Sequence, residues 1–467
     1  MTTDRAPAAT PITAHVPGPT SWLPGASFLA FRRDPLNFFV DTQRSYGDIA
    51  KFSFGPQQVF LVSHPDWIED VLVTSAKKFQ KGVALQRAKR LLGEGLLTSE
   101  GKHHLKQRRT IQPLFHRQHV QRFADAMVKH ASRWRETVSA GSTIDMSTEM
   151  AGLTLAIVGE TLFSSDVQGD VDEVRDALAA AFQTFSVAFL PGLEYFEKLP
   201  IPAFARLRRS RERLDRVILR VIDERRLKAD GSANALLQRD LIAMLLAARD
   251  PEHPSEPGMS DQQIRDEAMT IFLAGHETTA NAMAWTWHVL AGHPAAEAAL
   301  HEELTRVLKE RTPTVEDVAK LEYTKAIIAE SMRLYPPAWT IGRRVIEPHT
   351  IGGHAIAPGA LVIMSQWVVH RDPRWWGSPD AFMPERWLNA DLVGRMPGAG
   401  SPRPKYSYFP FGGGSRVCIG ESFAWTEAIL LLATIAQRWQ FVAQSAPALE
   451  PRITLRPRGL QMRPVPR

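Results

Sequence analysis

The residues best suited to chemistry lie at positions 411–420, which read FGGGSRVCIG and hold the single cysteine of the 467-residue sequence. A lone cysteine cannot form an internal disulfide bond, and it is usually a small buried hydrophobic residue. Here its neighbours favour chemistry instead. The three glycines at 412–414 allow backbone conformations that are closed to other residues and leave room for a flat group, while Arg416 places a positive charge two residues before the Cys418 thiol.

A buried helix is predicted to position this cysteine. The sequence after Gly420 reads ESFAWTEAILLLATIAQRW, and it is apolar on nearly every face over residues 428–436, as in a helix that is buried all round. Cys418 would then lie at the first turn of that helix, where free backbone N–H groups and the positive end of the helix dipole stabilise a thiolate. We therefore expect an anionic sulfur that has a partner.

This stretch resembles the haem-binding loop of the cytochrome P450 family, whose pattern is F-G-x-G-x-R-x-C-x-G. Every fixed position is filled, by Phe411, Gly412, Gly414, Arg416, Cys418 and Gly420. The resemblance implies that Cys418 is the axial thiolate ligand of haem iron, that Arg416 pairs with a haem propionate and that Phe411 packs beside the sulfur. An anionic sulfur pushes electron density toward iron, and backbone N–H groups and an apolar shell tune its basicity.

The composition is that of a globular protein with an extensive core. Hydrophobic residues make up 44% of the sequence, and its 33 prolines and 30 glycines are spread between the predicted elements. The length alone suggests about three domains, but no long linker or repeat divides the chain. We expect one haem-thiolate monooxygenase domain over residues 1–467, and the resemblance covers it from about residue 36 onward. The net charge of +6 is mild, and no dense run of Lys and Arg suggests nucleic-acid binding.

The N-terminal residues show no targeting signal. Residues 1–20 contain no apolar run of signal-peptide length and are expected to be disordered, and no run long enough to span a membrane occurs in the sequence. We expect a cytoplasmic, monomeric protein without a membrane anchor. The resemblance implies the cytochrome P450 fold, mainly α with a small β region, with a long central helix over a haem held by the cysteine loop. The β-rich parts are expected at residues 49–63 and 335–385.

A helix over residues 103–115 carries two polar faces. His104 and Arg108 share one face, and the basic residues Lys102, Lys106 and Arg109 cluster on the opposite face. Taken alone, both faces would be solvated. By resemblance, His104 and Arg108 match a W/H-x-x-x-R pair that holds a haem propionate, and the basic face would point outward, where an acidic electron donor docks.

A long helix is predicted over residues 260–292, opened by a capping box of Ser260 and Gln263. Near its middle lies AGHETT, residues 274–279, where Gly275 weakens the helix and Thr278 can bond back to a carbonyl, which together favour a local bend. Taken alone, this would be a tolerated glycine in a core helix. The stretch matches the family's oxygen-activating motif [AG]-G-x-[DE]-T, which implies that Thr278 hydrogen-bonds bound dioxygen and Glu277 relays protons from solvent.

Three further charged residues match family positions with a structural role. Glu330 and Arg333 lie three residues apart on one helical face, and Arg386 follows in the segment MPERW. By resemblance the three form a network that holds the cysteine loop and takes no part in catalysis. Arg343 matches an arginine that binds a haem propionate.

Four positions are candidate substrate contacts by resemblance, namely Leu97, Ala274, Ala338 and Trp339. Fatty-acid-hydroxylating members of the family that share AGHETT carry an arginine in the first hairpin, and the matching residue here is Gln57. A carboxylate that entered by this route would lose hydration without gaining a charged partner. We therefore favour a neutral, bulky terpenoid or steroid-like molecule over a fatty acid.

Together these motifs favour a monooxygenase of secondary metabolism that inserts one oxygen atom from O2 into an apolar molecule by hydroxylation or epoxidation. The cofactor would be haem b, iron protoporphyrin IX. Electrons would come from NADH or NADPH through a separate ferredoxin or flavodoxin and its reductase, because the sequence ends soon after the cysteine loop. Two alternatives stay open: a peroxide-driven peroxygenase or isomerase, whose members commonly lack the acid–threonine pair, and a non-catalytic haem-binding sensor or carrier.

Overall fold

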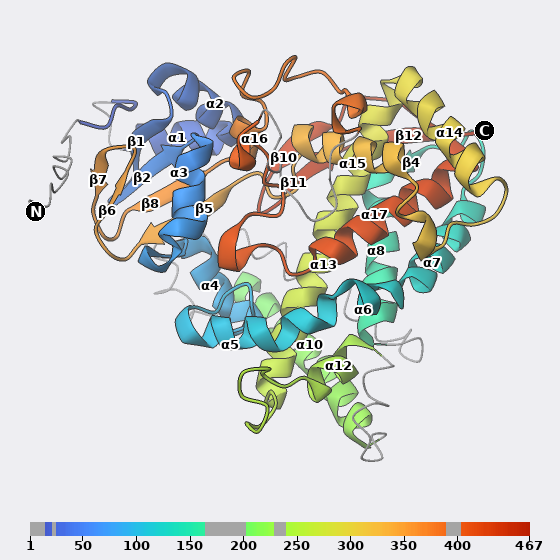
Figure 1. Cartoon of the computed structure of the whole chain (residues 1–467), viewed down its shortest axis with the longest axis horizontal. Coiled ribbons are helices and arrows are strands. Elements are labelled where there is room, and N and C mark those ends of the chain that lie inside the picture. The colour runs from blue at the N-terminus through green and yellow to red at the C-terminus, as the bar shows by residue number, and fades with distance from the viewer. Residues whose placement is uncertain (1–14, 21–24, 164–201, 228–239, 389–402) are drawn as a thin grey trace, which may run out of the picture. The chain divides into compact units, whose positions relative to one another are not determined.

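The computed structural model describes residues 15–20, 25–163, 202–227, 240–388 and 403–467 (Figure 1). The chain divides into two compact units. The first, here the sheet unit, comprises Met1–Gly82, Trp339–Pro379 and Met396–Val417, and the second, the helical unit, comprises Val83–Ala338, Asp380–Arg395 and Cys418–Arg467. The expected disorder of the N-terminal residues falls on positions that lie mostly outside the described residues.

The sheet unit is built around one mixed sheet. Its strands are β1 (Ile49–Phe54), β2 (Gln57–Val62), β3 (Phe79–Lys81), β5 (Ile341–Val345) and β8 (Leu361–Met364), with β6 (His349–Ile351) and β7 (His354–Ile356) as a separate hairpin. Its helical segments are α1 (Ala26–Arg33), α2 (Pro35–Tyr46), α3 (Pro65–Glu69), η1 (Asp70–Thr74), η2 (Ala76–Lys78), α16 (Gln366–Val369), η8 (Lys405–Ser407) and η9 (Gly414–Arg416).

The five strands lie in the order β1-β2-β8-β5-β3, and among them the β2–β8 pair alone runs parallel. The β1–β2 hairpin turns at Gly55, whose φ of 61° is a left-handed conformation that glycine adopts without strain. The inner strand β2 is buried over its last four residues, as expected of a strand with a neighbour on each side. An apolar core that includes Phe60, Val62 and Phe409 lies against this sheet.

The helical unit contains most of the helices. They are α4 (Val83–Leu92), α5 (Gly101–Ile111), η3 (Gln112–Phe115), α6 (Arg117–Gln121), α7 (Ala124–Thr137), α8 (Met146–Phe163), α10 (Pro202–Leu227), α12 (Leu241–Ala247), α13 (Asp261–Ala291), α14 (Pro294–Leu308), η6 (Val315–Asp317), α15 (Glu322–Leu334), η7 (Pro384–Trp387) and α17 (Glu421–Ala436). Its strands are β4 (Ile144–Asp145), β9 (Trp439–Ala443) and β12 (Gln461–Pro466), which form one sheet, and the hairpin β10 (Ala448–Pro451) and β11 (Leu455–Arg458). The predicted mainly α fold with small β regions is confirmed.

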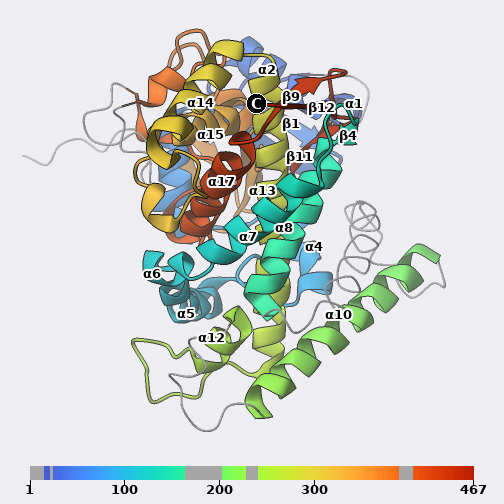
Figure 2. The same cartoon turned by 90° about the vertical axis from the view of Figure 1, so that its right-hand side faces the viewer.

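The longest helix, α13, is the predicted central helix. It begins at the predicted capping box, in which Ser260 and Gln263 bond each other's backbone N–H groups, and it ends at the expected place, before Gly292. α13 packs against α8, α15 and α17 (Figure 2). Most side chains of α13 are buried, but Ala274 is exposed and the next four residues are half-buried. This is the part of the helix that a ligand could reach.

Among the described residues, no helix is both long enough and apolar enough to cross a membrane.

Candidate active site

Cys418 lies two residues before Gly420, the N-cap of α17, as the sequence predicts. The side chain is accessible to a small molecule but is surrounded by protein atoms, and this burial raises the pKa of the Cys418 thiol to about 11. The backbone N–H of Gly420 and the charge on Arg108 oppose the shift but do not outweigh it. The Gly420 N–H thus acts in the predicted direction, but burial outweighs it, so an anionic sulfur here would need the partner that the sequence led us to expect.

The expected partner of such a sulfur is a metal cation. A coordinating metal ion deprotonates a thiol outright, since the metal–thiolate bond more than offsets the cost of burying the charge. The residues around Cys418 fit haem iron. The soft sulfur suits the metal, and the guanidinium of Arg108, which lies close enough to Cys418 to interact with it, could pair with an acidic group of the porphyrin. Burial lowers the pKa of Arg108, as expected of a cation in a partly enclosed site. His104, one turn earlier on α5, is 4% exposed.

The glycines of the cysteine loop lie where side chains would clash with the rest of the unit. A Cβ at Gly413 would lie 2.5 Å from the hydroxyl oxygen of Tyr406, and a Cβ at Gly414 would lie 2.0 Å from the carbonyl oxygen of Leu72. Gly414 also has a φ of 67°, which favours glycine. These glycines let the loop pack tightly against its own unit, and the expected room for a flat group stays a prediction.

Four predicted site residues belong to the sheet unit. Arg416 ends η9 and is half-buried, as is Phe411, while Arg343 on β5 is 8% exposed and donates to the carbonyl of Gly342 at 3.1 Å. Trp339 is 4% exposed and packs on Phe39, with ring centroids 5.9 Å apart. Their roles toward haem and substrate stay predictions.

The acid–threonine pair lies in the middle of α13. The Thr278 hydroxyl donates to the carbonyl of Ala274 at 2.6 Å, as predicted. The helix continues through Gly275, where a Cβ would lie 3.3 Å from a methyl carbon of Val158 on α8. The glycine therefore permits close packing of the two helices, a reason that the sequence did not reveal. Glu277 is half-buried, and its carboxylate accepts a hydrogen bond from the hydroxyl of Thr454 at 2.8 Å.

The predicted network of Glu330, Arg333 and Arg386 forms within the helical unit. Arg333 donates twice to the Glu330 carboxylate, at 2.8 Å each, and Arg386 donates to it at 3.0 Å. The indole N–H of Trp387 and the backbone N–H of Met383 complete its shell, at 2.8 and 3.0 Å. Since Glu330 and Arg333 are 0% exposed, this is a buried structural network.

The basic face of α5 does not simply point into solvent. Arg109 donates to Asp250 at 2.9 and 3.2 Å and pairs with Glu252 at 2.7 Å, and Lys106 pairs with Glu256. These hydrogen bonds from Arg109 and Lys106 lower the pKa of Asp250 and Glu256 respectively. The segment of residues 250–256, here the acidic loop, thus covers part of the face that the sequence assigned to an acidic electron donor.

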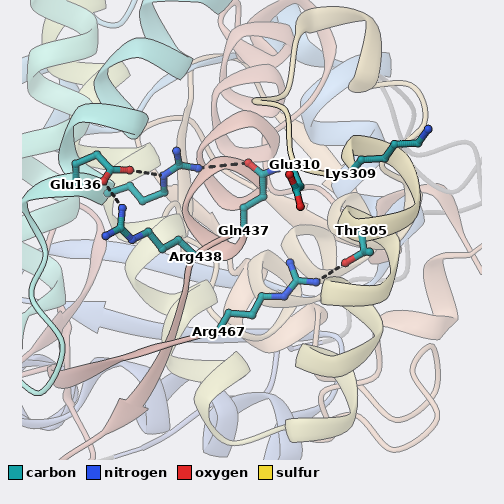
Figure 3. Close-up of a pocket in the computed structure, with 8 residues that line it drawn as sticks. Glu136, Thr305, Lys309, Glu310, Gln437, Arg438 and Arg467 are labelled. Atoms are coloured by element: carbon teal, nitrogen blue, oxygen red, sulfur yellow. Dashed lines mark hydrogen bonds and ion pairs between the residues drawn. The ribbon is translucent and has the colours of Figure 1, made fainter.

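One surface hollow of about 580 Å³ lies in the helical unit (Figure 3). Its lining is charged and polar, and consists of Arg135, Glu136, Thr305, Lys309, Glu310, Gln437, Arg438 and Arg467. Several of these side chains pair with one another, for example Arg438 with Glu136 and Arg135 with Gln437. A site for an apolar molecule needs a mainly apolar lining, so this hollow is not a candidate substrate pocket.

The candidate substrate contacts of the helical unit lie in suitable surroundings. Leu97 is half-buried against the apolar core formed by α8, α10, α12 and α13, and Ala338 is half-buried just after α15. In the sheet unit the amide of Gln57 donates to the carbonyls of Gln58 and Gly359, each at 2.9 Å. The Gln57 amide therefore bonds backbone carbonyls of its own hairpin and of the turn before β8. The four substrate contacts stay predictions.

Sequence reasoning missed Glu427, which lies on α17 and is 0% exposed. Burial raises the pKa of its carboxyl group to about 8. One acidic residue in an otherwise apolar run was the available signal. Thr454 and Asn281, the partners around Glu277, were also missed, although Asn281 stands one helical turn after Glu277.

Comparison with known proteins places these features in one family. The family model described as Cytochrome P450 matches residues 16–466. The chain is 36% identical to cyclooctatin synthase of Streptomyces melanosporofaciens, over 97% of this chain and 98% of that protein. It is 34% identical to cyclooctat-9-en-7-ol 5-monooxygenase of the same organism, over 94% and 89%, and 32% identical to pentalenene oxygenase of Streptomyces avermitilis, over 98% and 96%. The chain belongs to the cytochrome P450 family of haem-thiolate monooxygenases.

Proposed function

We propose that this protein inserts one atom of dioxygen into a neutral cyclic terpenoid, by hydroxylation or epoxidation. The observation that carries the proposal is the acid–threonine pair of Glu277 and Thr278 in the accessible middle of α13, a helix that packs against α17, the helix that Cys418 precedes. A haem-binding carrier would not need such a pair. A peroxygenase or an isomerase would not need protons delivered to dioxygen.

The proposed reaction consumes two electrons and two protons for each oxygen atom inserted, and the second oxygen atom leaves as water. Haem b, held by the Cys418 sulfur, would supply the activation of dioxygen, and Arg108, His104, Arg343 and Arg416 would hold its propionates. The chain's own task is to deliver protons. Glu277, which is half-buried, would take protons from solvent and pass them toward the hydroxyl of Thr278.

The electrons would come from NADH or NADPH through a separate ferredoxin or flavodoxin and its reductase. The exposed part of the α5 face, with Lys102 and Lys106, would receive the acidic surface of such a donor. The acidic loop already pairs with Lys106 and Arg109, so the donor would have to compete with Glu252 and Glu256 for these cations. The expected cytoplasmic and monomeric state stays a prediction.

The substrate class rests on two independent supports. Similar proteins carry the names of terpenoid molecules, cyclooctatin, cyclooctat-9-en-7-ol and pentalenene. In this chain Gln57 bonds neighbouring carbonyl groups and offers no charge to a carboxylate. A neutral polycyclic molecule therefore suits the protein better than a fatty acid.

A binding comparison tests the substrate class. The holoenzyme is titrated with pentalenene, dodecanoic acid and methyl dodecanoate, and the shift of the haem absorption band reports binding. We expect pentalenene to bind at least tenfold more tightly than dodecanoic acid, and the methyl ester to bind no more weakly than the acid. Tighter binding of the free acid than of both neutral molecules would overturn the proposal.

A further inference from the structure

Three side chains of α13 hold the tip of the β10–β11 hairpin. Glu277, Asn281 and Trp285 are spaced by four residues, so they lie along one face of the helix. The Thr454 hydroxyl donates to Oε1 of Glu277 at 2.8 Å, Nδ2 of Asn281 donates to Oγ1 of Thr454 at 3.1 Å, and the Trp285 indole donates to the carbonyl of Leu455 at 3.0 Å. The oxygen-activating part of α13 is thus tied to a segment far away in the sequence.

The direction of this hydrogen-bond chain is determined by its members. A threonine hydroxyl has one hydrogen to donate. Because the amide of Asn281 is the donor to the Thr454 oxygen, the hydroxyl hydrogen is left for the carboxylate of Glu277. Oε1 of Glu277 is therefore held as an acceptor, with a fixed donor on the hairpin side.

Thr454 is itself held firmly. It is 6% exposed and Asn281 is 5% exposed, so solvent does not replace their hydrogen bond. The carbonyl of Thr454 accepts from the N–H of Arg452 at 3.1 Å, and the N–H of the next residue, Leu455, donates to the carbonyl of Pro337 at 2.9 Å. The hydroxyl thus has a defined place beside the helix.

We propose that Thr454 is a positioning residue for the proton relay, because it sets the rotamer of Glu277 beside Thr278. This inference rests on the proposed function, since it takes Glu277 as the proton carrier. The hydrogen bond from the neutral hydroxyl orients the carboxylate, and Glu277 is only half-buried, so that solvent can reach part of its side chain. Without the bond, the side chain gains rotational freedom and spends less time in the orientation that serves Thr278.

Two variants of the holoenzyme separate positioning from simple packing. Thr454→Val keeps the shape of the side chain and removes the hydroxyl, while Thr454→Ser keeps the hydroxyl and removes a methyl group. The readout is the infrared band of the Glu277 carboxylate, identified as the band that is lost in Glu277→Gln. We expect the band to shift in Thr454→Val and to keep its position in Thr454→Ser. An unchanged band in Thr454→Val, or equal shifts in both variants, would overturn the proposal.

A stability cycle gives a second readout that needs neither substrate nor electron donor. The equilibrium constant for unfolding in urea is measured for Thr454→Val, Glu277→Met and the double variant. If the two side chains interact, the effect of the double variant on the unfolding equilibrium constant should differ about tenfold from the product of the two single effects, as for a hydrogen bond to a charged group. A ratio near one would contradict the inference. If Thr454→Val does not fold, Asn281→Leu replaces it, and the Glu277 band should then shift in the same direction. A failure to bind any terpenoid would refute the proposed substrate and leave both readouts unaffected.

Discussion

Two glutamates on helices of the helical unit differ in their burial and in their hydrogen-bond partners. Glu330 on α15 is 0% exposed and accepts hydrogen bonds from Arg333, Arg386, the Trp387 indole and a backbone N–H. Glu277 on α13 is half-buried and accepts one from the neutral hydroxyl of Thr454. The Glu330 carboxylate is enclosed by two guanidinium groups, whereas the Glu277 carboxylate is held by a hydroxyl and is partly open to solvent. The surroundings of the two residues therefore match the structural role predicted for Glu330 and the proton-relay role proposed for Glu277.

The largest effect is expected at the structural acid. Glu330→Gln removes the negative charge and leaves the buried guanidinium of Arg333 without its counter-charge, which should lower the free energy of unfolding by about 3–5 kcal/mol. Unfolding of the holoenzyme in urea measures the change. Glu256→Gln, in an exposed ion pair with Lys106, serves as the control and should cost less than about 1 kcal/mol. Equal effects of the two substitutions would show that the Glu330 network does not stabilise the fold.

Glu427 extends the comparison to a buried acid whose pKa is not lowered by any cation in the described part of the chain. Its folded-state pKa of about 8 lies above the ordinary value of 4.5, so between these values the folded protein keeps a proton that the unfolded chain releases. Stability from this group is therefore present at low pH and lost as the pH rises toward 8. In Glu427→Gln this loss of stability with rising pH should disappear. The free energy of unfolding of the parent protein should fall by up to about 1.4 kcal/mol per pH unit relative to that of the variant.

Urea unfolding at several pH values between 5.5 and 7.5 measures this difference. Glu256→Gln is again the control, because the pKa of Glu256 is lowered by Lys106 and its carboxylate stays ionised in both states over this range. Parallel stability curves for the parent protein and Glu427→Gln would mean that the buried carboxyl group does not keep its proton.

The functional side of the comparison is tested at Thr278. Thr278→Ala removes the hydroxyl next to Glu277, and we expect product per reducing equivalent to fall by about tenfold or more while hydrogen peroxide rises, because protons no longer reach dioxygen in the right place. Thr278→Ser keeps the hydroxyl and should stay close to the parent protein. The measurement compares NADPH consumed, product formed and peroxide released. A variant that couples electrons to product as well as the parent protein does would remove Thr278 from the relay.

The smallest effect is expected at the exposed acids of the acidic loop. Replacing Glu252 and Glu256 together by Gln frees cations of α5 and should tighten binding of an acidic plant-type [2Fe–2S] ferredoxin by about two- to fivefold at low salt. The gain should vanish at high salt. Glu450→Gln, on β10 and paired with Arg452, is the control. Unchanged or weaker binding by the double variant at low salt would show that the donor does not compete with this loop.

The local features of the site could be predicted from the sequence because each depends on neighbouring residues. The capping box of Ser260 and Gln263, the bond from Thr278 to Ala274 and the pairing of Glu330 with Arg333 all span three or four positions of one helix. Such contacts follow from helical geometry alone.

What the sequence did not show depends on contacts between distant segments. The hydrogen bond between Thr454 and Glu277 joins residues 177 positions apart, and the one between Arg109 and Asp250 joins residues 141 positions apart. The raised pKa of the Cys418 thiol depends on the burial of the whole loop, which no local pattern reports. These features follow from how the chain folds back on itself, and they decide how each acid behaves.

The central claim, that Cys418 is the thiolate ligand of haem, is tested most directly by the carbon-monoxide difference spectrum of the reduced holoenzyme. The parent protein should show the red-shifted Soret band of thiolate ligation, and Cys418→His, which supplies a nitrogen ligand in place of sulfur, should lose that shift while still binding haem. A red-shifted band that persists in Cys418→His would contradict the account, because the sulfur ligand would then have to come from elsewhere.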